Sequence, residues 1–156
     1  MNLKDITIIS IIFTLDRISK LYVIHLDSKL SDPVILSSKY VNIQLIWNEG
    51  VAFGLLAFDD KFFYNLTTGF IIIIILTLLY FIKKTKNIEK YSFLMILGGA
   101  SGNVFDRFFY SSVPDFIDIH YHNFHWFIFN VADIFITLGV FLLIYLEIFL
   151  RNKKDL

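Results

Sequence analysis

Residues 62–82 read FFYNLTTGFIIIIILTLLYFI, an unbroken stretch without a single charged side chain. A helix that crosses the hydrocarbon core of a bilayer needs about 20 largely apolar residues. This stretch is long enough, and Lys83 and Lys84 follow it directly. It therefore predicts a membrane-spanning helix that ends at a basic surface.

Segments of similar length and apolar character occur at residues 6–25, 91–110 and 130–150. The first carries Asp16, Arg17 and Lys20 in its second half, and the last carries Asp133 and Glu147. Charged residues inside such segments are costly in lipid and usually mark a functional site. The sequence predicts a mainly α-helical membrane protein built as a bundle of four transmembrane helices.

The composition agrees with a membrane protein. Of the 156 residues, 56% are hydrophobic, against roughly 45–50% in soluble domains. The formal net charge is +0, so no basic excess indicates a nucleic-acid partner. Cysteine is absent, which excludes disulfides, thiolate metal ligands and a cysteine nucleophile. We expect one integral membrane domain over residues 1–156.

Lysine and arginine in short loops indicate which side of a membrane protein faces the cytoplasm. One side of the predicted bundle carries most of them, namely Lys4, Lys83, Lys84, Lys86, Lys90, Arg151, Lys153 and Lys154. The opposite side has only Lys29, Lys39 and Lys61, spread over a longer stretch. We expect both termini in the cytoplasm. No small-x-small cleavage site follows the first apolar segment, so we expect a retained helix rather than a signal peptide.

The segment of residues 26–61 lies on the predicted outer side. Within it, residues 41–45 read VNIQL and alternate apolar and polar side chains, a pattern typical of a strand. Trp47 and Trp126 stand where an interfacial aromatic belt is expected. The sequence therefore predicts a small β-sheet on the outer surface.

Two aspartates, Asp115 and Asp133, flank the stretch between the third and fourth predicted helices. Taken alone, Asp115 after Pro114 reads as a turn residue, and Asp133 reads as an acid in the first turn of a helix capped by Asn130. Two carboxylates that meet at one membrane face can share a proton and carry out acid–base chemistry on water. The pair is therefore the candidate catalytic site.

A second polar cluster lies in the third predicted helix. Asn103 and Asp106 are three residues apart and share a helix face. Asp106 is either a third catalytic acid or a partner of Arg107 or Lys20, and the cost of burying a charge favours the pair. Asp16 and Lys20, four residues apart, are expected to form an ion pair within the first helix.

The sequence GASG at residues 99–102 matches a short pattern of intramembrane serine proteases. A serine nucleophile needs a nearby base. No histidine lies in the interior of a predicted helix. We therefore interpret these small residues as a site of close helix packing.

His120, His122 and His125 occur with Asp118 in the segment that precedes the last helix. His120 and His122 would share one face of a strand, and the residue types suit a metal ion, but the spacing is loose. We expect solvent-facing loop residues and no metal.

Residues 48–54, NEGVAFG, mix amides with small residues. They could offer hydrogen bonds to an extended peptide or form a turn that enters the second helix. The residues alone leave both readings open.

Five short motifs follow one another along the chain. They are Asp16-x-x-x-Lys20, Asn48-x-Gly50-x-Ala52-Phe53, Gly98-Gly99-Ala100-x-Gly102-Asn103-x-x-Asp106-Arg107, Val113-x-Asp115-Phe116-Ile117 and Phe129-Asn130-x-Ala132-Asp133. In these motifs, and over nearly its whole length, the chain resembles the bacterial lipoprotein signal peptidases, also called signal peptidase II. The resemblance implies four membrane helices with a small outer sheet.

The resemblance also implies a membrane aspartyl endopeptidase of the bacterial inner membrane. Such enzymes remove the signal peptide from lipid-modified prolipoproteins just before a cysteine that carries a diacylglyceryl group, with membrane lipids around them and no cofactor. By motif, Asp115 and Asp133 match the catalytic pair near the outer leaflet. Supporting positions around the site are Asp16, Lys20, Asn48, Gly50, Asn103, Asp106, Arg107, Asn130 and Ala132. Inhibition by the peptide antibiotic globomycin is expected, and Pro114 departs from the aliphatic residue usual in the family.

Two other function classes fit the residues less well. A proton-coupled transporter could relay protons along Asp16, Asp106, Asp115 and Asp133, but these acids cluster toward one face instead of lining a path across the bilayer. A non-enzymatic membrane subunit could use the same charges to join partner helices. Neither reading accounts for the order of the motifs.

Overall fold

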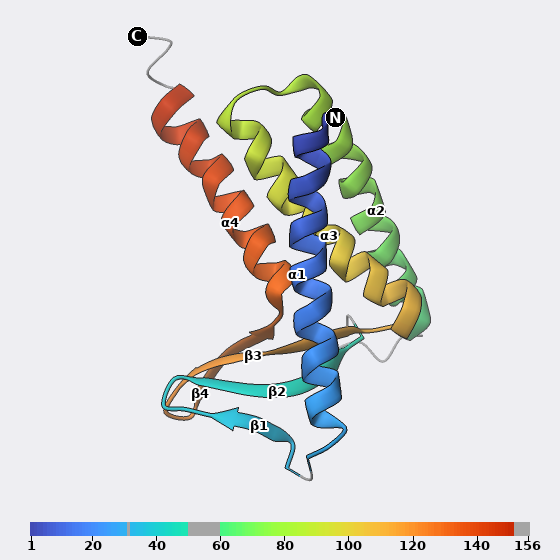
Figure 1. Cartoon of the computed structure of the whole chain (residues 1–156), viewed down its shortest axis with the longest axis vertical. Coiled ribbons are helices and arrows are strands. Elements are labelled where there is room, and N and C mark those ends of the chain that lie inside the picture. Colours follow the sequence, from blue (N-terminus) through green and yellow to red (C-terminus); the bar gives the residue numbers. More distant parts are fainter. Residues whose placement is uncertain (31, 50–59, 152–156) are drawn as a thin grey trace.

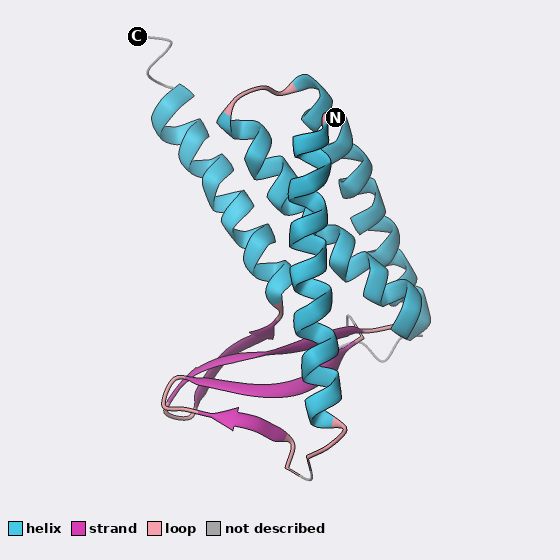
Figure 2. Ribbon diagram, viewed as in Figure 1, coloured by secondary structure: helices cyan, strands magenta, loops and turns pink. Residues whose placement is uncertain are grey.

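The computed structural model describes residues 1–30, 32–49 and 60–151. Within this part of the chain, four long helices and four strands make up the fold (Figures 1 and 2). The helices are α1 (Leu3–Asp27), α2 (Asp60–Lys84), α3 (Ile88–Tyr110) and α4 (Val131–Leu146), with a π-helical turn η1 (Glu147–Arg151). The strands are β1 (Val34–Ser37), β2 (Val41–Asn48), β3 (Val113–Tyr121) and β4 (Phe124–Phe129).

The helices run side by side, and the sheet lies across one end of them (Figure 1). The N-terminus, the α2–α3 connection and the C-terminal end of α4 lie at the other end. Helix α3 is central, because it packs against α1, α2 and α4. Helices α1, α3 and α4 therefore meet the sheet at one end of the molecule.

Each helix extends close to its predicted bounds. Helix α1 begins at a capping box in which Asn2 and Asp5 exchange backbone and side-chain hydrogen bonds. Helix α3 ends at Tyr110, followed by Ser111 in the left-handed conformation with φ 57°. The fourth predicted helix, residues 130–150, is regular α-helix only to Leu146 and continues as η1.

The four strands form one antiparallel sheet in the order β1-β2-β3-β4. The predicted outer segment contributes β1 and β2. The other half comes from residues 113–129, where we expected a loop, and this expectation was wrong. Pro114 and Asp115 suggested a turn, but they pair with Trp47 and Ile46 of β2 inside the sheet. A proline is tolerated at the start of a strand, where a missing N–H breaks few ladder bonds.

Small residues let α3 approach its neighbours closely. A Cβ atom at Gly98 would lie 2.9 Å from Cβ of Ile12 on α1, and one at Gly99 would collide with the carbonyl oxygen of Ala132 on α4. The interpretation of the GASG stretch as packing surface is therefore confirmed for Gly99. The hydroxyl of Ser101 donates to the carbonyl of Leu97 at 2.7 Å, within its own helix.

Two of the helices in the described part of the chain are long and apolar enough to cross a membrane, over Tyr64–Lys84 and Val131–Phe149. Both carry exposed apolar side chains, such as Phe70 at 62% and Phe141 at 64%. Helices α1 and α3 have the length but carry more charged residues, which lowers their hydropathy. Four spans were predicted, and hydropathy alone supports two of them.

Candidate active site

Lys20 is the centre of a buried polar cluster between α1 and α3. Its side chain is fully buried, and its ammonium group donates to Oδ2 of Asp16 at 2.8 Å, to Oδ2 of Asp106 at 2.7 Å and to Oδ1 of Asn103 at 2.9 Å. An ammonium has three hydrogens, so every donor is used. The predicted Asp16–Lys20 pair is confirmed. Because a buried charge is costly unless it is paired, the cluster fixes the two helices against each other.

Asp16 also connects α1 to the start of α4. Its Oδ1 atom accepts a hydrogen bond from the backbone N–H of Ala132 at 3.0 Å. The first N–H groups of a helix have no partner within the helix, and the helix dipole favours a negative charge there. Gly102 leaves the room for this contact, because a Cβ atom at that position would collide with the Asp16 carboxylate. Asp16 therefore positions the N-terminus of α4.

Asp106 has a second cationic partner that the sequence did not indicate. Its Oδ1 atom lies 2.6 Å from Nη1 of Arg17. Arg107, which was a predicted partner, instead lies with its guanidinium carbon 5.2 Å from the ring centre of Tyr64. Among the described residues, no ion pair joins Arg107 to Asp106. Successive helix residues point in different directions, so Arg107 faces α2 while Asp106 faces α1.

Asp133 is held at the first turn of α4. Asn130 is the N-cap, as predicted: its Oδ1 atom accepts from the N–H of Asp133 at 3.1 Å, and its own N–H donates to Oδ2 of Asp133 at 3.1 Å. The amide of Asn103 donates to the other carboxylate oxygen at 2.8 Å. Both oxygens of Asp133 therefore accept hydrogen bonds from fixed donors.

Asp115 projects from β3 and is only 4% exposed. Its Oδ1 atom accepts from the amide of Asn130 at 2.6 Å, and Oδ2 accepts from the amide of Asn48 at 2.9 Å. Burial raises the pKa of Asp115 to about 6, against the two amide hydrogen bonds, which lower it. The negative charge of Asp133 contributes to this raised pKa, so the two carboxyl groups interact electrostatically.

The two aspartates share one hydrogen-bonded network. The amide of Asn130 donates to Asp115 and also to Oδ1 of Asn103 at 3.2 Å, while Asn103 donates to Asp133. As a whole residue, Asp115 is buried, whereas Asp133 is half-buried. It also lines a cleft at the sheet end of the molecule, whose other walls are Ile46, Trp47, Asn48, Glu49 and Ile128. A substrate in this cleft would lie against one carboxyl group, with the second in the adjoining network.

Most of the predicted site residues therefore come together. The network at the sheet end of the helices contains Asp16, Lys20, Asn48, Asn103, Asp106, Asp115, Asn130, Ala132 and Asp133. Arg107 lies outside it, against Tyr64, and Gly50 falls outside the described residues. Arg17 was missed, although it directly follows Asp16 inside an apolar helix. An arginine inside an apolar helix needs a buried acidic partner, so its presence in the sequence already predicts such a contact.

The histidines near the hairpin are arranged differently from the predicted loop. Asp118 and His120 lie on β3 and His125 on β4, and their ligand atoms all lie within 4.8 Å of one another. Asp118 is fully buried, and His122 stands in the turn with φ 52°. The prediction that all four face solvent was therefore wrong for Asp118.

Comparisons with known proteins identify the family. The family model described as Signal peptidase (SPase) II matches residues 8–149. The lipoprotein signal peptidase of Pelagibacter ubique (strain HTCC1062) is 47% identical over 158 residues, covering 99% of this chain and 95% of that protein. The lipoprotein signal peptidase of Anaplasma phagocytophilum (strain HZ) is 36% identical over 159 residues, covering 99% and 97%.

Solved structures agree with these sequence matches. A bacterial membrane enzyme solved by the in meso method at 2.3 Å resolution superposes with a TM-score of 0.76 at 31% identity, covering 98% of this chain and 93% of that one. A second, solved at 1.9 Å resolution, gives 0.77 at 30% identity, covering 95% and 94%. The likeness therefore extends over the helices and the sheet together. The chain belongs to the signal peptidase II family.

Proposed function

We propose that this protein is a membrane aspartyl endopeptidase that removes the signal peptide from prolipoproteins just before the diacylglyceryl-modified cysteine. The observation that carries the proposal is the pairing of Asp115 and Asp133 through Asn130 and Asn103 beside a cleft. Family membership supports the peptidase activity and the class of substrate. The paired carboxyl groups support the aspartyl mechanism.

The surroundings of each aspartate suggest its role. Asp133 sits in the first turn of α4 and accepts bonds from two N–H donors, an arrangement that favours a charged carboxylate and suits a general base. Asp115 is buried, and its pKa of about 6 suits a group that carries a proton and donates it. Coupled carboxyl groups titrate as a pair, so the roles describe one protonation state of that pair.

The reaction then follows general acid–base hydrolysis without an acyl-enzyme. Asp133 takes a proton from water as the water oxygen bonds to the scissile carbonyl carbon, and Asp115 gives its proton to the carbonyl oxygen. The tetrahedral diol collapses when Asp133 passes its proton to the amide nitrogen and the C–N bond breaks. Asp115 recovers a proton from the diol hydroxyl, which restores the starting state of the pair.

The amides around the pair hold the geometry that this chemistry needs. Asn48 donates to Asp115 from the edge of the cleft, and it is close enough to orient a peptide there. Asp16, Lys20, Asp106 and Ala132 hold α1, α3 and α4 in register behind the site. Gly50 and Arg107 complete the residues proposed from the family motifs.

The four helices are proposed to form a transmembrane bundle. Helices α1 and α3 also present large apolar side chains outward, including Ile18 at 60% and Phe109 at 69% exposure. In water such surfaces would favour association, whereas in a bilayer they face lipid. The charged residues Asp16, Lys20 and Asp106 of these helices are buried and paired, so they do not face the lipid. This removes the main objection to the spanning of α1 and α3.

The orientation is proposed from the distribution of basic residues. Lys83 and Lys84 end α2 at the end opposite the sheet, where the N-terminus also lies (Figure 1). With that end in the cytoplasm, both termini are inside the inner membrane and the sheet lies at the outer leaflet. The diacylglyceryl chains of a substrate would then stay in the bilayer while its scissile bond reaches the cleft. The peptide antibiotic globomycin is expected to occupy the same site.

The experiment uses purified protein in detergent and one prolipoprotein prepared with and without the diacylglyceryl group. We expect cleavage of the lipidated form alone, a product whose first residue is the modified cysteine by mass spectrometry, and inhibition by globomycin. Cleavage at another bond, or equal cleavage of both forms, would contradict the proposed specificity. Proton transport by reconstituted vesicles without any cleavage would favour the transporter instead, although the four acids lie in one network at one end of the helices.

A further inference from the structure

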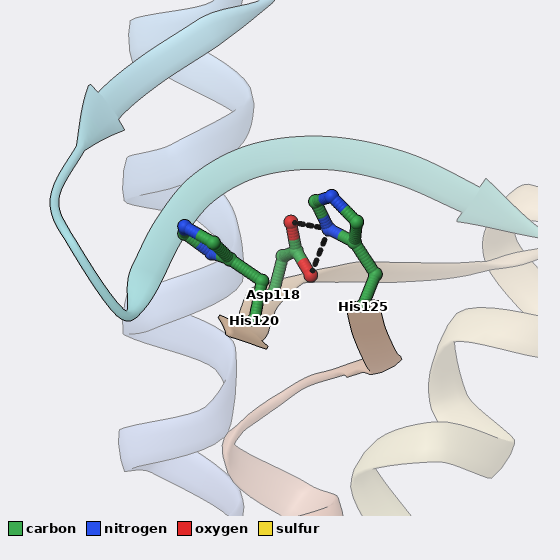
Figure 3. A group of neighbouring side chains, drawn as sticks. All are labelled: Asp118, His120 and His125. Atoms are coloured by element: carbon green, nitrogen blue, oxygen red, sulfur yellow. Dashed lines mark hydrogen bonds and ion pairs between the residues drawn. The ribbon is translucent and has the colours of Figure 1, made fainter. Parts of the chain in front are cut away.

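A second cluster of ionisable groups lies on the hairpin of β3 and β4, outside the network of the two catalytic aspartates. It consists of Asp118, His120 and His125, whose side chains project from the same face of the hairpin (Figure 3). Both oxygens of the Asp118 carboxylate contact Nδ1 of His125, at 3.0 and 2.8 Å. The rings of His120 and His125 stack with their centres 5.2 Å apart.

The strand register creates this arrangement. His120 and His125 are direct cross-strand partners, so their side chains lie on one face. Asp118 precedes His120 by two residues, the spacing that returns a strand to the same face. The register shifts between Asp118 and His120, which indicates a bulge. Bulges re-aim side chains and are common next to functional sites.

The carboxylate of Asp118 is placed as an anchored ligand. Its side chain is fully buried, and the amides of Asn42 and Gln44 lie 3.4 and 3.3 Å from its Oδ2 atom. Metal-ligating carboxylates are typically oriented by hydrogen bonds of this kind from surrounding residues. A buried carboxylate is costly unless it is paired, and His125 is a positive partner only when it is protonated.

His120 provides the observation that a simple Asp–His pair does not explain. Its Nδ1 atom is buried, and it has no hydrogen-bond partner among the described residues. A buried polar atom without a partner is costly, at about 1–3 kcal/mol. His120 belongs to the same cluster as the carboxylate that already binds His125. A cation bound between the three groups would satisfy it.

We propose that Asp118, His120 and His125 form a binding site for a divalent transition-metal ion, of which zinc fits the donor set best. Two imidazoles and one carboxylate are ligands that zinc takes, with water in the fourth position. Bonds of 2.0–2.2 Å place tetrahedral ligand atoms about 3.3 Å apart. The His125–Asp118 contacts, at 3.0 and 2.8 Å, are slightly shorter than this spacing and would open as the ion enters, and His120 approaches through side-chain rotation within the 4.8 Å cluster. The metal replaces the proton between His125 and Asp118.

Such an ion would join β3 to β4 on the outer sheet. Asp115 lies three residues before Asp118 on β3, and β4 leads directly into Asn130. The ion would therefore stiffen the strands that carry the catalytic network without touching it. The site is independent of the proposed peptidase mechanism, so either can fail without the other.

The test measures metal binding by protein that carries no histidine tag and has been dialysed against a chelator. Zinc is titrated by calorimetry in detergent, and cobalt(II) is used as a spectroscopic probe of tetrahedral coordination. We expect one ion per chain and a higher melting temperature with zinc. His120→Gln should weaken binding at least about tenfold, because loss of even an outer-shell partner costs roughly 10–100-fold. If the cluster were only a structural Asp–His pair, His120→Gln would not change metal binding, because this variant leaves the His125–Asp118 contact intact.

His122→Asn is the matched control, because it removes the neighbouring histidine of the turn, and asparagine tolerates the left-handed conformation at that position. It should bind zinc as tightly as the parent. Should His120→Gln fail to fold, the parent protein gives the answer by NMR, where cobalt should broaden the ring signals of His120 and His125 and spare those of His25. The proposal is overturned if the parent shows no saturable binding at one ion per chain, if folded His120→Gln binds as tightly as the parent, or if cobalt spares His120.

Discussion

The side-chain amide of Asn130 donates to Oδ1 of Asp115 at 2.6 Å, joining the start of α4 to strand β3. The same residue caps α4 through the backbone N–H of Asp133. One asparagine therefore sets the position of both aspartates. A helix cap that reaches a neighbouring strand ties the geometry of the site to the folding of α4.

Asn130→Ser separates the cap from the contact to Asp115. Serine is a good N-cap residue but has no amide to reach β3. We expect a folded protein that loses about 1–3 kcal/mol of stability, because the amide hydrogen bonds to Asp115 and to Asn103 are both removed. Turnover should fall roughly 10–100-fold, because small misplacements of reacting groups are costly. Melting temperature and kcat for the lipidated substrate are measured together; unchanged kcat would mean that Asn130 acts only as a cap.

The pH dependence of kcat/KM should reflect the protonated Asp115. Its pKa of about 6 predicts a decline in activity as the pH rises through that region, because the proposed acid loses its proton. The Asn48 amide stabilises the charged carboxylate, so Asn48→Ala should raise the pKa of Asp115 and move the decline to higher pH. Asn123→Ala, which removes an exposed amide in the turn between β3 and β4, should leave the profile in place. A shift of the decline to lower pH in Asn48→Ala would contradict the assignment.

Lys20→Met tests the buried cluster behind the site. Removing the ammonium leaves Asp16 and Asp106 buried without their shared partner, and we expect a loss of about 3–5 kcal/mol in the free energy of unfolding. Lys90→Met is the comparison, because Lys90 pairs with Asp5 at 2.6 Å but is 21% exposed. It should cost much less than Lys20→Met, because solvent screens an exposed ion pair. Thermal unfolding in detergent measures both, and equal losses would argue against a special role for Lys20.

Gly99→Ala tests the close approach of α3 and α4. The added methyl group would collide with the backbone of Ala132, next to Asp133, so the helices must separate. We expect a loss of about 1–3 kcal/mol, typical of overpacking, together with lower activity. Gly69→Ala on α2 is the control, since a Cβ there meets nothing within 4 Å. Helix propensity predicts that it is neutral or stabilising by up to about 1 kcal/mol.

Features encoded locally could be predicted from the sequence. The helix positions follow from apolar length, and the cap at Asn130 follows from an acid three residues later. The Asp16–Lys20 pair follows from helix spacing. In each case the residues that interact lie within one turn or one segment of the chain.

Features that depend on distant segments could not. Strand β3 pairs with β2 about seventy residues earlier in the chain, and the Pro114-Asp115 pair resembles a turn when read alone. The Arg17–Asp106 contact depends on how α1 meets α3. The same limit hid the cluster around Asp118, because loose sequence spacing becomes close contact only through the strand register. Local patterns suggest which residues are special, and tertiary packing decides their partners.

The most direct test of the central claim compares the parent with Asp115→Asn and Asp133→Asn in cleavage of a diacylglyceryl-modified prolipoprotein. These changes keep the side-chain shape and remove the ionisable group, and Asp32→Asn serves as a control at an exposed residue. We expect both site variants to be folded and inactive while the parent and the control cut before the modified cysteine. Normal cleavage by either folded site variant would contradict the catalytic pair and direct attention to Asp106.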